Sequence, residues 1–146
     1  MEITVITKGA ERALDAAQTA IKKSDARAVR EAARFALKPL KKNLSFSGAT
    51  APVGQLGKRS GRLFRQVKVK YFNRRDGMLG AAIKVKGDRS FVARFHEHGT
   101  KSHGRGGGPL IARQVFARTW KAIEQATATL YAQSFERNFR IQTLGF

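Results

Sequence analysis

The hydrophobic positions of the first 44 residues recur mostly at the spacing of an α-helix. Leu14, Ala17 and Ile21 fall on one helical face, and a second set with the same spacing follows Ser24-Asp25. Serine and aspartate favour the position that starts a helix, so this dipeptide predicts a break between two helices. The two helices are expected at about residues 9–22 and 25–44.

Two further features modify this helical region. The branched and threonine residues around Ile3 and Val5 predict a short β-strand before the first helix. Pro39 lies inside the second helical pattern and has no backbone N–H to donate. We therefore expect Pro39 to kink that helix or to end its regular hydrogen bonding a turn early.

Two glycine-rich stretches without periodicity predict long, flexible loops. Residues 45–61 contain four glycines and a proline, and residues 99–108 contain five glycines. Loops of this length are uncommon in compact domains and are often functional or ordered only on binding. Both loops are therefore expected to contact partners.

Between the two loops the hydrophobic period changes to two, which indicates β-strands. A three-residue loop at 75–77 pairs Val69 with Ile83 and keeps the apolar faces together. Gly77 suits the left-handed third position of such a loop. We predict an antiparallel hairpin with strands from Leu63 to Phe72 and from Leu79 to Val85.

The polar side of this hairpin carries four lysines, called here the basic face. Its members are Lys68, Lys70, Lys84 and Lys86. The predicted register places Lys68 directly opposite Lys84, and like charges in that position destabilise a sheet. Two interpretations stay open: the lysines are splayed and solvated, or the face is kept basic for an acidic protein or for DNA.

The last third of the chain predicts one long helix. Residues 90–98 fit either a strand or a short helix, because the run is too short for periodicity to decide. From Pro109 a four-three pattern through Phe116, Trp120 and Ile123 predicts a helix that continues to about residue 139. Trp120 is expected in the core or at a subunit interface. The fold class expected is α+β, with N-terminal helices and a long C-terminal helix packed on a small antiparallel sheet, in one domain over residues 1–146.

The amino-acid composition limits the classes of partner and site that this chain can have. The 146 residues include 29 lysines and arginines against 10 acidic residues, a formal net charge of +19, which favours an anionic partner or nucleic acid. The absence of cysteine excludes disulfides and thiolate metal sites. No apolar run approaches the roughly 20 residues that span a bilayer, and the start lacks the features of a signal peptide. We expect a protein made in the cytoplasm that has no membrane partner.

Three segments carry motifs in a characteristic order. The motif residues are Ser60, Gly61, Arg62 and Leu63, then Ala93, Arg94, Phe95, Glu97, Gly99 and Thr100, and finally Pro109 before the last helix. Over about residues 28 to 125 this order resembles the neck and tail-completion family of lambda-like long-tailed bacteriophages. From the residues alone, Gly61 and Gly99 are expected where the chain changes direction. Two interpretations stay open for Arg62, Arg94 and Glu97: a local ion-pair cluster or unrelated surface charges.

The resemblance implies a virion structural protein and not an enzyme. Such a protein forms a ring, expected to have six copies, in the neck or tail of the particle. Its implied partners are copies of itself, the adjacent head-closure or stopper, tail-terminator and tail-tube proteins, and the genomic DNA that passes through the opening. The alternative is a stand-alone basic nucleic-acid-binding protein, which the net charge of +19 favours.

Catalytic, metal and cofactor sites are not expected. His96, His98 and His103 suggest a metal site, and with it a metal-dependent nuclease, but no second group of ligands has suitable spacing. The glycines at 104–108 precede a helix, as in phosphate-binding loops, yet the lysine and hydroxyl residue of a P-loop are missing. With ten scattered acidic residues, no pair of catalytic carboxylates is indicated.

Overall fold

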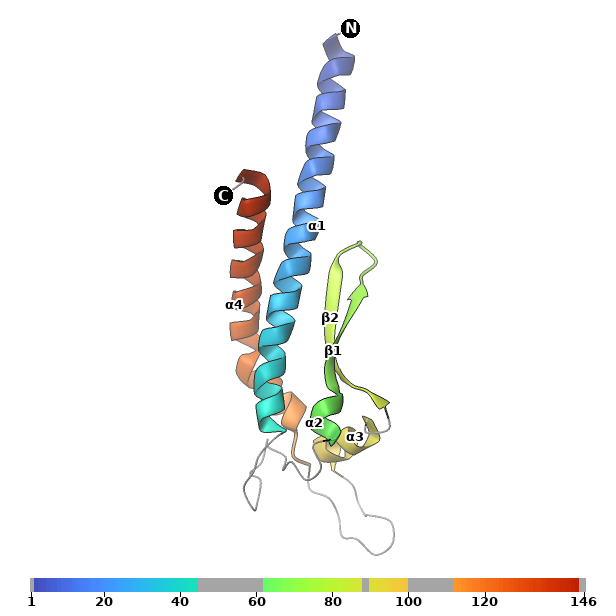
Figure 1. Ribbon diagram of the computed structural model, residues 1–146, viewed down its shortest axis with the longest axis vertical. Helices are drawn as coiled ribbons and strands as arrows, with labels where there is room; N and C mark the ends of the chain where they lie inside the picture. The colour runs from blue at the N-terminus through green and yellow to red at the C-terminus, as the bar shows by residue number, and fades with distance from the viewer. Residues whose placement is uncertain (1, 45–61, 88–89, 100–111, 145–146) are drawn as a thin grey trace, which may run out of the picture. The chain divides into compact units, whose positions relative to one another are not determined.

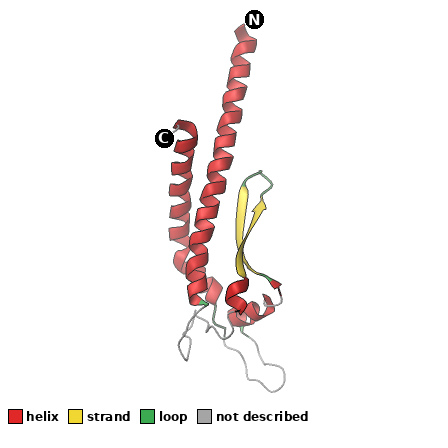
Figure 2. Cartoon of the chain, in the orientation of Figure 1, coloured by secondary structure: helices red, strands yellow, loops and turns green. Residues whose placement is uncertain are grey.

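A computed structural model of the chain describes residues 2–44, 62–87, 90–99 and 112–144 (Figure 1). In chain order its elements are α1 (Glu2–Asn43), α2 (Arg62–Gln66), β1 (Val67–Asn73), β2 (Leu79–Val85), α3 (Ser90–His98) and α4 (Val115–Leu144). The two strands form one antiparallel sheet, and the rest of the regular structure is helical (Figure 2). The predicted α+β class is confirmed.

The chain forms two compact units. Unit 1 comprises Met1–Ala32, Tyr71–Ala81 and Ala128–Phe146, and unit 2 comprises Ala33–Lys70 and Ala82–Thr127. The long helices α1 and α4 and the hairpin each contribute residues to both units. The expectation of a single domain over the whole chain stays a prediction.

Helix α1 runs without interruption from Glu2 to Asn43, so two sequence predictions were wrong: the strand near Ile3 and the break at Ser24-Asp25. Ser24 and Asp25 are both buried, and Asp25 accepts hydrogen bonds from other elements of unit 1 in place of capping a helix. Pro39 does not end the helix, which continues for another turn to Asn43.

Unit 2 has an apolar core. Leu40 of α1 and Leu44, directly after that helix, pack with Val67 of β1 and Val115 of α4, and half-buried neighbours from the hairpin and α2 surround them. Residues 62–66 form a short helix, where a strand was predicted from Leu63. Positions 63 and 67 share a face at either helical or strand spacing, so the periodicity of the sequence did not distinguish the two.

The hairpin has the predicted register. The N–H of Arg74 donates to the carbonyl of Met78 at 2.8 Å, and that of Lys86 donates to Gln66 at 3.0 Å. These bonds place residues whose numbers sum to 152 opposite each other, so Lys68 faces Lys84. Gly77 closes the three-residue loop with a φ of 76°, the left-handed conformation expected there.

In unit 1 the parts of α1 and α4 that belong to it lie side by side and antiparallel (Figure 1). Their buried residues are small or polar: Ala20, Ser24, Asp25, Ala28 and Ala32 on α1, and Ser134 and Asn138 on α4. Arg137 pairs with Glu31 at 2.8 Å, and Arg27 donates to Asn138 at 3.4 Å. Small residues let two helix backbones approach closely. The contact between these segments of α1 and α4 is therefore stabilised by close packing and hydrogen bonds more than by large apolar side chains.

Helix α4 differs from its predicted bounds. It begins at Val115 and not near Pro109, because residues 112–114 are not helical and Gln114 has a φ of 49°. It continues to Leu144, one turn beyond the predicted end. Trp120 is 48% exposed, so the prediction that it lies in the core is wrong within this chain, and the subunit-interface alternative stays a prediction.

Candidate functional site

The described part of this motif, residues 93–99, ends α3 and contacts the start of α4 in unit 2. Residues 90–98 are helical, which decides between the two forms that the sequence allowed. Ala93 is buried on the inner face of α3. Gly99 ends the helix with a φ of 75°, and its N–H donates to the carbonyl of Phe95 at 2.7 Å. Helix α3 therefore ends at a residue in the left-handed conformation, which favours glycine.

Glu97 fixes the start of α4. Its carboxylate accepts the backbone N–H of Phe116 at 2.9 Å and that of Ala117 at 2.8 Å. The first N–H groups of a helix have no partner within the helix, and the helix dipole favours a negative charge beside them. The N–H of Arg113 also donates to the carbonyl of His96 at 2.7 Å, so α3 holds the segment that leads into α4 at two points.

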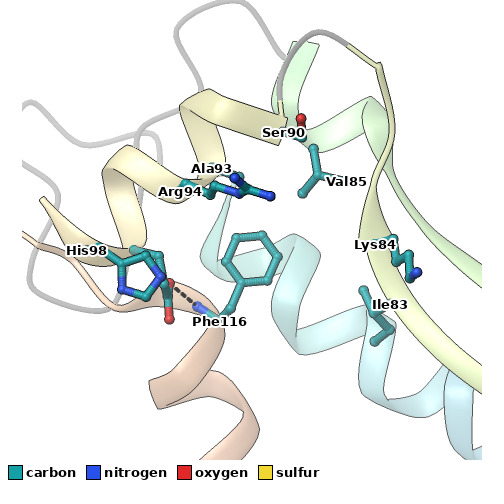
Figure 3. A pocket seen from close by; sticks show the side chains of 9 residues that line it. Ile83, Lys84, Val85, Ser90, Ala93, Arg94, His98 and Phe116 are labelled. Carbon is teal, nitrogen blue, oxygen red and sulfur yellow. Dashed lines mark hydrogen bonds between the residues drawn. The ribbon is translucent and has the colours of Figure 1, made fainter.

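A hollow of about 300 Å³, called here the α3 pocket, lies between α3, β2 and the first turn of α4 in unit 2 (Figure 3). Its lining residues are Ile83, Lys84, Val85, Ser90, Ala93, Arg94, Glu97, His98 and Phe116. Figure 3 shows the Phe116 ring between α3 and β2, with the Arg94 side chain extending from α3 toward β2. The pocket thus has an apolar interior and cations around it.

The charges at this pocket are unbalanced. Lys84 and Arg94 are exposed, and neither forms an ion pair with a carboxylate among the residues that the structure describes. The Glu97 carboxylate is engaged by the amides of α4 instead of by Arg94, so the ion pair considered between these two motif residues is not formed. The side chain of Arg62, the third member of that cluster, lies outside the described residues.

The basic face has the arrangement predicted from the sequence. Lys68, Lys70, Lys84 and Lys86 are all exposed, and Lys68 is opposite Lys84 in the sheet. Lys84 also lines the α3 pocket, so the two features are continuous within unit 2. The structure describes no acidic side chain in an ion pair with any of these four lysines.

Unit 1 contains a buried polar cluster that the sequence did not reveal. The Tyr131 hydroxyl donates to Asp25 Oδ1 at 2.7 Å, and the N–H of Leu79 donates to Asp25 Oδ2 at 3.2 Å. Burial and the hydrogen bond to Asp25 raise the pKa of Tyr131 to about 12. These contacts join α1, β2 and α4 across 106 and 54 positions of the chain, so no local pattern could indicate them.

The histidines lie in a helix and not in a strand. His96 and His98 are two positions apart on α3, about 200° around the helix, so they leave it in nearly opposite directions. Among the described residues no group of three potential ligands is placed to hold a metal ion. His103 and the glycines at 104–108 lie outside the described residues.

Large apolar side chains are exposed in both units. In unit 1 they are Leu14, Ile21, Tyr71, Phe72, Ile141 and Leu144, and in unit 2 they are Phe35, Phe95 and Trp120. Leu14 and Leu144 are the most exposed of them, at 60% and 64%. Single exposed hydrophobics are ordinary in proteins, but clustered ones mark interaction surfaces.

Four motif positions lie outside the described residues: Ser60, Gly61, Thr100 and Pro109. Leu63 is half-buried against the core of unit 2, and Phe95 is exposed on α3. No described helix is long and apolar enough to cross a membrane. Among protein-family models, curated proteins and solved structures, no match to this chain is found.

Proposed function

We propose that this protein is a structural component of the neck or tail of a long-tailed bacteriophage particle. In this role it assembles into a ring at the head–tail junction and contacts the neighbouring neck and tail proteins. Its chemistry is subunit contact and electrostatics, without a catalytic step. Its place of action is then the virion, after synthesis in the host cytoplasm.

The observation that carries this proposal is the structural role of the motif residues between 93 and 99. Ala93 is buried, Glu97 accepts two amides of α4, and Gly99 ends α3 in a left-handed conformation. Each of these residues has a structural role in α3 or at the start of α4. A motif of this kind supports a protein defined by its architecture and its surfaces.

The surface supports the same role. Exposed apolar side chains occur in both units, and an open pocket with an apolar interior lies beside the basic face. A net charge of +19 suits a ring that contacts acidic neighbours or encloses DNA. These features are expected of a subunit that buries much of its surface on assembly.

A second candidate is a stand-alone nucleic-acid-binding protein. The observation that favours it is the basic face, because four exposed lysines without described acidic partners attract a phosphate backbone. Such a protein would act outside the particle. The two functions therefore differ in what the loss of the protein does to particle assembly.

The experiment is deletion of the coding sequence in the phage or prophage genome that carries it, with the particles viewed by electron microscopy. We expect DNA-filled heads and separate tails, and joined particles should return when the full chain is supplied in trans. A Glu124→Ala variant serves as a control, because Glu124 is exposed on α4 away from the α3 pocket. Joined, infectious particles from the deletion would overturn the proposal and favour the second candidate.

A further inference from the structure

The charges of this chain are unevenly distributed along its length. The first 21 positions hold two of the 29 basic residues and three of the ten acidic residues, so this segment carries a net charge of −1. The remaining 125 positions then carry +20. Exposed carboxylates in this weakly charged segment attract exposed cations of a second copy, which favours contact of unlike surfaces over contact of like surfaces.

This segment presents a defined surface on α1. Residues 9–16 are all exposed, and Leu14 is 60% exposed. Glu11, Leu14 and Asp15 share one helical face, because positions three and four apart are neighbours on an α-helix. This face, called here the acidic α1 face, combines one exposed aliphatic side chain with two carboxylates, and the exposed Arg12 lies at its edge, three positions before Asp15.

The α3 pocket has the complementary chemistry. Ile83 and Phe116 provide an apolar interior, and the cations Lys84 and Arg94 lie beside it. Neither cation is paired with a carboxylate among the described residues, and Glu97 is already engaged at the start of α4. An apolar side chain flanked by two carboxylates can therefore make apolar contacts inside this pocket and ionic contacts beside it.

We infer that the α3 pocket of one copy binds the acidic α1 face of a second copy, with Leu14 as the apolar anchor and Glu11 and Asp15 beside Lys84 and Arg94. This contact joins two different surfaces, and a repeated contact of that kind generates a ring when the rotation closes. The inference rests on the proposed ring and names the surfaces that would form it.

The test uses charge reversal in the purified full chain, with self-association measured by sedimentation velocity over a concentration series at low salt. The pocket variant is Lys84→Glu with Arg94→Glu, and the helix variant is Glu11→Lys with Asp15→Lys. Each variant alone should self-associate roughly tenfold more weakly than the wild type or worse, because like charges then meet at the contact. An equimolar mixture of the two variants should recover association, since each supplies the surface that the other needs.

A matched control carries the same change in net charge elsewhere. Lys38→Glu with Lys121→Glu alters two exposed lysines of unit 2 that do not line the α3 pocket, and it should associate like the wild type. A Leu14→Ala variant should weaken association without any change in charge. Far-ultraviolet circular dichroism of every variant should match the wild type.

Three results would overturn this contact: a wild type that stays monomeric at the highest concentration, a mixture that fails to associate, or a control as weak as the pocket variant. The ring proposal itself would then depend on the particle experiment. Separate heads and tails after gene deletion would keep the proposed function while rejecting these two surfaces. Joined particles would reject the function whatever the purified chain does.

Discussion

Glu97 on α3 accepts the backbone N–H of Phe116 on α4 at 2.9 Å, nineteen positions along the chain. The loss of such a cap costs about 1–2 kcal/mol, because helix-end amides lose their acceptor. Glu97→Ala should therefore lower the free energy of unfolding by this amount, and Glu97→Gln by less, since an amide oxygen still accepts. Urea denaturation followed by circular dichroism measures both.

The matched control for this prediction is Glu124→Ala. Glu124 is an exposed glutamate further along α4, and its replacement should change stability by less than about 0.5 kcal/mol. Equal stability of the Glu97 and Glu124 variants would show that the contact at the start of α4 does not hold the junction.

The hydroxyl of Tyr131 is predicted to stabilise unit 1 through Asp25. Tyr131→Phe removes the donor and leaves the buried carboxylate with the N–H of Leu79. Hydrogen bonds to charged groups contribute about 1.5–3 kcal/mol, so the free energy of unfolding should fall by a value in that range. Tyr71→Phe is the control, because Tyr71 is 38% exposed and its replacement should have little effect. Equal unfolding midpoints for the two variants would contradict the role of this pair.

The same pair predicts an alkaline transition. Burial and the hydrogen bond to Asp25 raise the pKa of Tyr131 from 10.0 to about 12, so the folded chain holds this proton more tightly than the unfolded chain does. The stability from this group is complete below pH 10 and is lost as the pH rises toward 12. The difference between the phenolate absorbance titrations of the wild type and Tyr131→Phe should have its midpoint near 12. A midpoint near 10 would show that Tyr131 does not hold its proton through Asp25.

The basic face is predicted to carry partner electrostatics and to contribute nothing to stability. Lys68→Gln with Lys84→Gln removes two like charges that face each other, so the melting temperature should be equal or higher. Binding to double-stranded DNA should weaken, and the slope of log affinity against log salt should decrease by up to about 2. Lys38→Gln with Lys121→Gln is the control for total charge. A clear fall in melting temperature for the first variant alone would contradict the exposed placement of this face.

The hairpin was the part of the fold most fully predictable from the sequence. Its register depends on the local alternation of apolar residues and on Gly77 in a three-residue loop, and both are visible within twenty residues. The long final helix was also predicted, with an early start. Its true start depends on Glu97, which reaches the first turn from α3 and leaves no signal in the pattern around Val115.

The wrong predictions for α1 also result from contacts between residues that are far apart in the sequence. Ser24-Asp25 is a common helix-start signal, but Asp25 finds partners in Tyr131 and Leu79, and alanine-rich flanks let the helix continue. Of the candidate site, the basic face was predictable because it follows from strand alternation. The α3 pocket was not, since its walls come from β2, α3 and α4 and meet only in the folded unit.

The proposed ring at the head–tail junction can be observed in the particle itself. The measurement is a reconstruction by electron cryomicroscopy of that junction, in particles whose copies of this chain carry a small fused marker domain. A ring predicts marker density repeated around the particle axis at the neck or the upper end of the tail, expected six times. Finished particles without the chain, or with a symmetric two-fold dimer as its only assembled form, would contradict it.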